Sequence, residues 1–255
     1  MTKAIEIFNQ LEKGILNIIK AADIYSLYIL GSLRKELPSK DLIEDLIANP
    51  RVSLLAICGE AYKEEEIKIL EQNEHLKKIG EQILLSSYTS YEIYMIEKFK
   101  EYYNNLLSDK DTEFIENSLQ KLSFRSLKEI KNNYYDFLNI DLPSFEIDIS
   151  TTEKCNFKPK NTWDALNLIS KARNEIAHTG ESKIYKIVTL VDSWDPFDFI
   201  RMWVNLFDVN FDLLIYEKRT TRLVGEYKAR LANSIKMGPP RGRRYSRVRR
   251  SALCE

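Results

Sequence analysis

The sequence predicts an all-α protein: a helical bundle with an additional N-terminal helical region and a flexible basic C-terminal tail. Apolar residues recur at steps of three and four through most of the chain, which is the period of a buried helix face. Good capping residues stand at the ends of these segments. Residues 236–255 are rich in arginine, glycine and proline and poor in apolar side chains, so they cannot bury enough surface to fold alone.

Length and composition favour a folded protein of the cytoplasm. The chain has 255 residues, 44% of them hydrophobic, which is enough for one large or two small domains. Neither a signal-peptide core nor an apolar run of about 18 residues is evident, so we expect a cytoplasmic protein with no membrane contact. Its cysteines are far apart, without metal-ligand spacing, and fit reduced thiols better than disulfides or a zinc site: Cys58, Cys155 and Cys254.

Charge is distributed unevenly along the chain although its sum is zero. Of 38 basic and 38 acidic residues, seven basic and one acidic lie in 236–255, which gives that segment a charge of +6 and the remainder −6. One interpretation is an arm that attracts RNA or DNA phosphates without sequence preference. The other is a solvated tail lying on the acidic body, and the sequence does not decide between them.

Residues 1–79 form the predicted N-terminal helical region. Its first helix ends near Gly31 and Pro38. The apolar stripe of that helix comprises Ile5, Phe8, Leu11, Ile15, Ile18, Ala22, Tyr25 and Ile29.

Three shorter segments complete this region. Ser39 caps a short helix that ends near Ala48, and an apolar run follows over residues 52–58. The segment 60–79 is heavily charged and contains His75. Because charged residues surround His75, we expect it on a solvated helix face and not in a catalytic site.

Residues 80–218 form the predicted main bundle, and residues 219–255 a C-terminal extension that includes the tail. The first helix of the bundle covers residues 81–107, with a stripe typical of a protein core: Leu84, Tyr88, Tyr91, Met95, Phe99, Tyr102 and Leu106. A second helix begins after Ser126, three residues before Glu129, which is a capping-box pattern. Its inward residues are Leu127, Ile130, Tyr134 and Phe137.

Two segments follow the motif helix described next. The apolar run 184–191 fits a strand or a buried helical turn, and the sequence does not settle which. The last helix is capped by Asp195 and has Pro196 in its first turn. This helix would either close the bundle or pack against a partner helix. Its stripe comprises Phe197, Ile200, Val204, Phe207, Phe211 and Leu214.

The helix with the most informative residues begins near Asn161 or Thr162 and ends at Gly180, a favourable left-handed cap. One face of this helix is apolar, comprising Ala165, Leu168, Ile169, Ala172 and Ile176. Asn167, Asn174 and His178 fall on the other side. At about 100° per residue Arg173 lies roughly 140° from His178, so helical stacking alone does not pair them.

Arg173, Asn174 and His178 are the candidate catalytic residues. Histidine exchanges protons most readily near neutral pH, and the arginine fork is the best side-chain partner for a phosphate. The spacing therefore indicates phosphodiester chemistry. The alternative is that Arg173 and His178 neutralise the last carbonyls of the helix, as basic residues in a final turn often do.

At this point the chain resembles the HEPN superfamily. The Arg-Asn-x-x-x-His form of residues 173–178, preceded by Ser-Lys-Ala in a late helix of an all-α bundle, is similar to the HEPN signature. The segment 84–92, Leu-Leu-Ser-Ser-Tyr-Thr-Ser-Tyr-Glu, is similar to an early HEPN helix whose apolar stripe carries a Ser or Phe-Glu element. The resemblance covers residues 80–218, and among HEPN groups the RiboL-PSP type is one of the two nearest.

The resemblance implies a metal-independent endoribonuclease without cofactors, acting in toxin or antiviral defence systems as a homodimer whose motif helices face one another. His178 would be the acid/base, Arg173 the ligand of the scissile phosphate, and Asn174 a residue that orients the site. The 2′-hydroxyl of RNA would attack its own 3′-phosphate. A two-fold axis would bring the His face of one helix to the Arg edge of its mate, with interface residues Trp163, Asn167 and Ser170.

Other functions stay open beside this one. A non-catalytic HEPN-like module would dimerise and bind nucleic acid or a partner protein, and a purely structural bundle would bind protein partners alone. The RNA target is not encoded in a recognisable pattern. Three regulators also stay open: an antitoxin, a sensor formed by residues 1–79, or a larger defence complex.

Overall fold

The computed structural model describes residues 2–35, 39–48, 64–106, 112–147, 159–182 and 196–211. Every regular element in these ranges is a helix, which confirms the all-α prediction. Residues 1–210 belong to one compact unit. The predicted runs 52–58 and 184–191, the cap at Asp195 and the basic tail lie outside the described residues.

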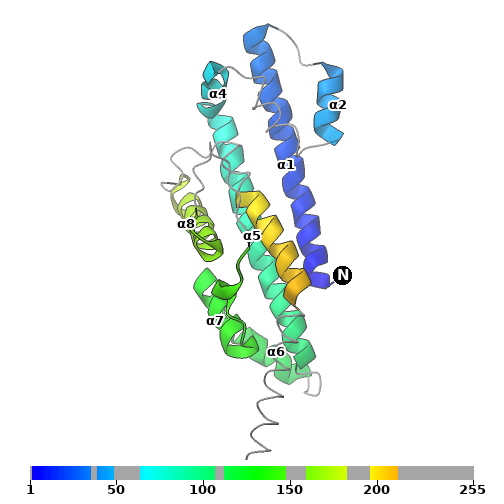
Figure 1. The fold of residues 1–255 in the computed structure, drawn as a ribbon, viewed down its shortest axis with the longest axis vertical. Coiled ribbons are helices and arrows are strands. Elements are labelled where there is room, and N and C mark those ends of the chain that lie inside the picture. Colours follow the sequence, from blue (N-terminus) through cyan, green and yellow to red (C-terminus); the bar gives the residue numbers. More distant parts are fainter. Residues whose placement is uncertain are drawn as a thin grey trace, which may run out of the picture. The chain divides into compact units, whose positions relative to one another are not determined.

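The helices, shown in Figure 1, are α1 (Lys3–Arg34), α2 (Lys40–Ala48), α4 (Glu64–Glu71), α5 (Glu74–Leu106), α6 (Thr112–Gln120), α7 (Leu127–Leu138), the 3₁₀ turn η1 (Leu142–Ser144), α8 (Thr162–Thr179) and a last helix over 196–211.

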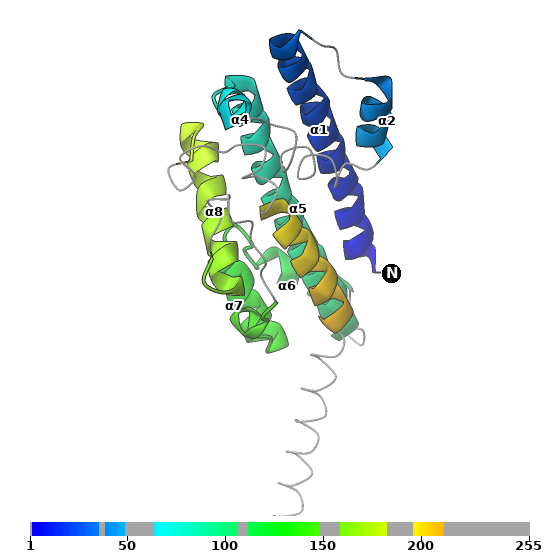
Figure 2. The same cartoon turned by 45° about the horizontal axis from the view of Figure 1, so that its top comes forward.

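Helix α5 is the central element. In both views it runs between α1 on one side and α8 on the other (Figures 1 and 2). It can contact both neighbours because apolar, aromatic and small side chains cover more than one of its faces. Most of the predicted stripe is buried, as are residues outside it: Ile83, Leu84, Tyr88, Tyr91, Tyr94, Met95 and Phe99. The aromatic residues of α5 therefore form core, as the stripe predicted.

Helix α5 begins before the expected domain boundary between residues 79 and 80 and crosses it. The side-chain oxygen of Asn73 accepts hydrogen bonds from the backbone N–H groups of His75 and Leu76, at 3.1 Å each. This cap starts the helix at Glu74, and α5 then runs through residues 79 and 80 without a break. The first helices and the motif helix thus share one central element. His75 is exposed, as expected.

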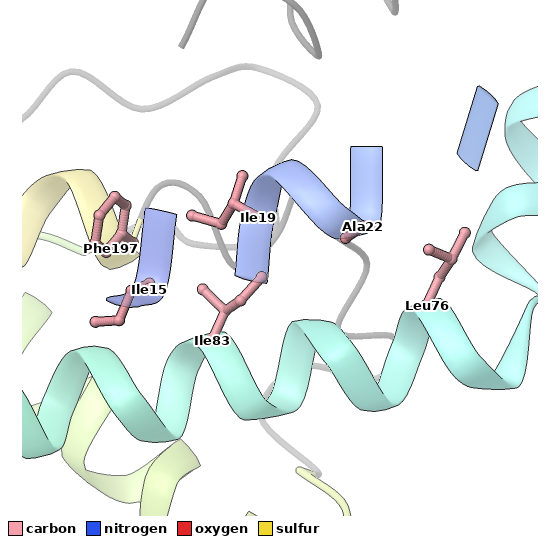
Figure 3. Close-up of a cluster of buried hydrophobic side chains, with 6 residues drawn as sticks. All are labelled: Ile15, Ile19, Ala22, Leu76, Ile83 and Phe197. Atoms are coloured by element: carbon pink, nitrogen blue, oxygen red, sulfur yellow. The ribbon is translucent and has the colours of Figure 1, made fainter. Parts of the chain in front are cut away.

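Helix α1 packs along α5 through an apolar cluster. Six buried side chains from α1, α5 and the last helix make up this cluster, drawn as sticks in Figure 3: Ile15, Ile19, Ala22, Leu76, Ile83 and Phe197. The helix ends at Arg34, between Gly31 and Pro38, which were predicted to mark its end, and Lys35 takes the left-handed cap conformation with φ 58°. The N–H of Lys35 bonds the carbonyl of Gly31, so the glycine accepts the capping bond instead of making it.

The length and apolar composition of α1 are sufficient for a membrane span, although no such segment was predicted from the sequence. In this structure its apolar face packs against α5. A buried helix of a soluble protein meets the same criteria of length and composition. The finding therefore leaves the cytoplasmic localisation a prediction.

Helix α7 begins with a variant of the predicted capping box. The side-chain oxygen of Ser126 accepts from the N–H of Glu129 at 3.2 Å. The carboxylate of Glu129 reaches back one residue beyond the cap, to the N–H of Arg125 at 2.7 Å. The predicted inward face is correct except for Phe137, which is 42% exposed while Leu138 is buried, because the stripe advances by four residues after Tyr134.

The last helix closes the bundle, which is one of the two placements that its stripe left open. Phe197, Ile200, Val204 and Phe207 are buried. Trp203 stacks on Phe207 at 4.6 Å between ring centroids and meets Tyr91 of α5 edge-on at 5.3 Å.

A buried polar cluster joins this last helix to α1 and α5. Oδ1 of Asp208 accepts hydrogen bonds from the Thr2 hydroxyl at 3.2 Å, the Tyr94 hydroxyl at 3.0 Å and Nζ of Lys98 at 2.6 Å. The side chain of Lys98 is 3% exposed, and this ion pair offsets part of the cost of its burial. Burial, with Asp208 adding to it, raises the pKa of Tyr94 far above its ordinary value, so the phenol remains a donor.

Candidate active site on helix α8

The motif helix begins and ends where the sequence predicted. The side-chain oxygen of Asn161 accepts from the N–H of Asp164 at 2.8 Å, and Gly180 takes the left-handed cap with φ 75°. The buried face comprises Thr162, Ala165, Leu166, Ile169, Ala172 and Ile176. It includes Leu166, which was not expected there, in place of the half-buried Leu168. The inner face is thus rotated toward Arg173.

Helices α5 and α8 run antiparallel. Near the start of α5, Nζ of Lys78 donates to the carbonyl of Gly180 at 2.7 Å, just past the end of α8. Farther along α5, Glu92 meets Arg173, one and a half to two turns before that end. The two contacts fix which part of α5 lies beside each half of the motif.

Arg173 is held by three groups. Its Nη2 lies 3.4 Å from Oε2 of Glu92, and its Nη1 donates to Oδ1 of Asn174 at 2.9 Å. Its guanidinium carbon lies 5.9 Å from the ring centroid of Tyr88, within the range of a cation–π contact. The side chain remains 31% exposed. The arginine is therefore anchored at the α5 edge of α8 and still open to an anion.

Burial dominates the electrostatics of the residues that hold Arg173. It raises the pKa of Glu92 above the ordinary 4.5, although the charge of Arg173 acts in the opposite direction. Burial also raises the pKa of Tyr88 to about 12, so this phenol is neutral at physiological pH. Ser170 lies beside the Tyr88 hydroxyl and favours its ionised form, but no hydrogen bond of good geometry joins the two.

His178 lies apart from Arg173. It is exposed, and within the described part of the chain we find no hydrogen bond or ion pair to its side chain. The carbonyl of Gly180, just past the last turn of α8, accepts from Nζ of Lys78. The structure brings Arg173 and Asn174 together and leaves His178 on the solvent side.

The other residues expected at an interface lie on or near the same outward side of α8. Trp163, Asn167 and Ser170 are partly exposed. The side-chain nitrogen of Asn167 donates to the carbonyl of Trp163 at 2.9 Å. Their accessible surface borders the exposed Asn174 and His178.

Glu92, Tyr88 and Lys78 contact the motif helix in ways that the sequence did not assign. Tyr88 was expected in the core, where it lies, and Glu92 had no role of its own. The spacing within α8 cannot reveal such partners, because they depend on the antiparallel packing of two helices distant in sequence.

Comparisons with known proteins add no relative. No family model matches this chain, and no curated protein or solved structure matches it. The HEPN resemblance consequently rests on the residues themselves.

Proposed function

We propose that this chain is a metal-independent endoribonuclease with a HEPN-type bundle. It acts as a homodimer in which Arg173 of one protomer and the partner's His178 serve one site. The position of these two side chains on α8 supports the proposal: Arg173 is anchored at the α5 edge, while His178 is exposed on another face. Five residues at about 100° each separate them by roughly 140°. A second copy of α8 supplies the convergence that one helix lacks.

The chemistry requires proton transfer and charge stabilisation alone. The 2′-hydroxyl of RNA attacks the adjacent phosphorus, the bond to the 5′-oxygen breaks, and a 2′,3′-cyclic phosphate forms. His178 exchanges protons with the attacking or the leaving oxygen, since its exposed imidazole is accessible to substrate. The guanidinium of Arg173 binds the non-bridging oxygens, and Asn174 holds one of its nitrogens.

Such a nuclease suits a toxin or antiviral effector of the cytoplasm. A positioned acid/base accelerates a reaction by about 10²–10⁴-fold, which is modest for a metabolic enzyme and adequate where a few cuts arrest growth. An antitoxin or defence-complex protein is then the expected partner. A non-catalytic RNA-binding or protein-binding module is the alternative, distinguished by the following experiment.

The first test is cleavage of total cellular RNA in excess EDTA by the wild-type protein, His178→Ala and His75→Ala. We expect EDTA-resistant cutting with 2′,3′-cyclic ends for wild type and His75→Ala, and none for His178→Ala. His75 is a matched control because it is the second histidine of the chain and is also exposed. Equal cutting by His178→Ala would remove that residue from the site, and RNA binding without cutting would favour the binding module.

The composite site has a test of its own. Co-expression of Arg173→Ala with His178→Ala chains produces heterodimers in which one of two sites is intact. We expect each variant alone to be inactive and the mixture to regain about a quarter of wild-type cleavage. A mixture that stays inactive, although heterodimers form, contradicts the shared site.

A further inference from the structure

Glu92 occupies a position unfavourable for a carboxylate. Its side chain is 14% exposed, and within the described residues its single hydrogen bond is the 3.4 Å contact with Arg173. Burial raises the pKa of Glu92 in spite of the nearby guanidinium. Ionised Glu92 is consequently less stable in the folded protein than in the unfolded chain.

Other acids on α5 have shorter contacts. Glu81 pairs with Lys78 at 2.8 Å, Glu97 with Lys100 at 2.7 Å, and Glu101 accepts from the N–H of Ala4 at 2.8 Å. These distances are typical of strong charge-assisted bonds. The Glu92–Arg173 pair lies beyond that range, so stabilisation of the fold does not account for Glu92.

The contact instead restricts the movement of Arg173. An arginine side chain has many rotamers and loses entropy when it binds a phosphate. Glu92 and Asn174 each engage one terminal nitrogen, and Tyr88 lies against the guanidinium. The remaining N–H groups are left for an anion. Prior ordering of this kind lowers the cost of the catalytic arrangement.

We propose that Glu92 is a positioning residue for Arg173: from α5 it holds the guanidinium at the edge of α8 in the orientation that receives the scissile phosphate. The inference rests on the proposed ribonuclease function. Glu92 acts through Arg173 and does not contact RNA. The Tyr88 ring supports the same orientation from beneath the guanidinium.

The test compares Glu92→Gln and Glu92→Ala with the matched control Glu97→Gln on the same helix. We expect kcat to fall about tenfold in Glu92→Ala and less in Glu92→Gln, whose amide oxygen still accepts from Nη2, while KM changes less than about twofold. Melting temperatures of the Glu92 variants should equal or exceed that of wild type.

Several outcomes would overturn the proposal. One is wild-type kcat in Glu92→Ala while Arg173→Ala is inactive, which leaves the ribonuclease function intact. Another is a loss of kcat that parallels a loss of melting temperature, since that indicates a structural role.

A second measurement applies even if the wild-type protein does not cleave RNA. Nuclear spin relaxation of the Arg173 Nε–H group reports its mobility directly. We expect a more mobile group in Glu92→Ala than in wild type and in Glu97→Gln. Equal mobility contradicts the positioning role whether or not RNA is cut, so failure of this inference is distinguishable from failure of the proposed function.

Discussion

At the scale of the single residue, Arg173 lies between the protein interior and solvent. Its guanidinium lies against the buried Tyr88 and Glu92 of α5, and part of the side chain remains in solvent. A positive group in this position offsets the charge of a carboxylate that has little other compensation. Loss of Arg173 therefore affects the fold as well as any phosphate binding, and the two effects must be separated.

The pH dependence of stability separates them. In Arg173→Met, Glu92 loses the charge that lowers its pKa, so its folded-state pKa rises farther above the ordinary 4.5. Folding then binds a proton, and stability falls as the pH rises through this window. We expect a loss of about 1–3 kcal/mol at pH 7 and a smaller loss at pH 4, measured by urea unfolding. The double variant Arg173→Met/Glu92→Gln should lack the pH dependence that Arg173→Met adds. An equal loss of stability at pH 7 and pH 4 in Arg173→Met would contradict the role of Glu92.

The sequence predicted the two ends of the motif helix but not the partners of Arg173. Asn161 and Gly180 were recognisable because capping uses neighbouring backbone groups. The pairing of Arg173 with Glu92 was not, since it joins residues 81 positions apart. Tyr88 was recognised as core, but nothing in its own helix indicates the cation above its ring.

At the scale of the element, α8 depends on both of its ends. Asn161 caps the first turn, and the carboxylate of Asp164 reaches back to the N–H of Lys160 at 2.9 Å. In α7, likewise, Ser126 caps the N–H of Glu129, and the carboxylate of Glu129 accepts from the N–H of the residue before the cap. Both helices therefore begin through reciprocal side-chain bonds. The sequence predicted such a pair for α7 and only the N-cap for α8.

Removal of the α8 cap should destabilise the motif helix measurably. We expect Asn161→Ala to lower the free energy of unfolding by about 1 kcal/mol and Asn161→Gly by a few tenths. Chemical denaturation monitored by circular dichroism provides the values, and Ser126→Ala is the matched change in α7. If Asn161→Ala destabilises the protein less than Asn161→Gly does, Asp164 alone maintains the first turn.

Element boundaries were predicted where local chemistry decides them. Helix α2 ends at Ala48 and α8 at Thr179, as expected. Helix α1 passes Gly31 because its packing on α5 outweighs the low helix propensity of a single glycine. Phe137 was predicted to face inward. Its ring does contact Phe99 and Tyr103, but the residue stays 42% exposed.

At the scale of the molecule, the Asp208 cluster connects distant parts of the chain. Thr2, Lys98 and Asp208 belong to the start of α1, to α5 and to the last helix. A carboxylate that accepts three donors in a mostly buried site is strongly coupled to the fold. The cluster therefore links the unfolding of the first and last described helices.

Asp208→Leu should be among the most destabilising single changes in residues 1–210. Because the variant removes the carboxylate that accepts from the Tyr94 hydroxyl and from Lys98, whose side chain is 3% exposed, we expect a loss of about 3–5 kcal/mol. The double variant Asp208→Leu/Lys98→Met removes both charges and should recover most of it. Thermal unfolding of the three proteins gives the comparison. A single variant as stable as the double would contradict the coupling.

The outward face of α8 has a consequence for how this chain can change over time. Asn174, Ala177 and His178 are exposed, whereas the residues that hold the helix to α5 lie on its inner face. Exposed substitutions away from caps usually alter stability by less than about 0.5 kcal/mol. Substitutions on the outward face can thus alter cleavage or dimer contacts while the fold persists, whereas substitutions on the buried inner face disturb the packing of α8 itself.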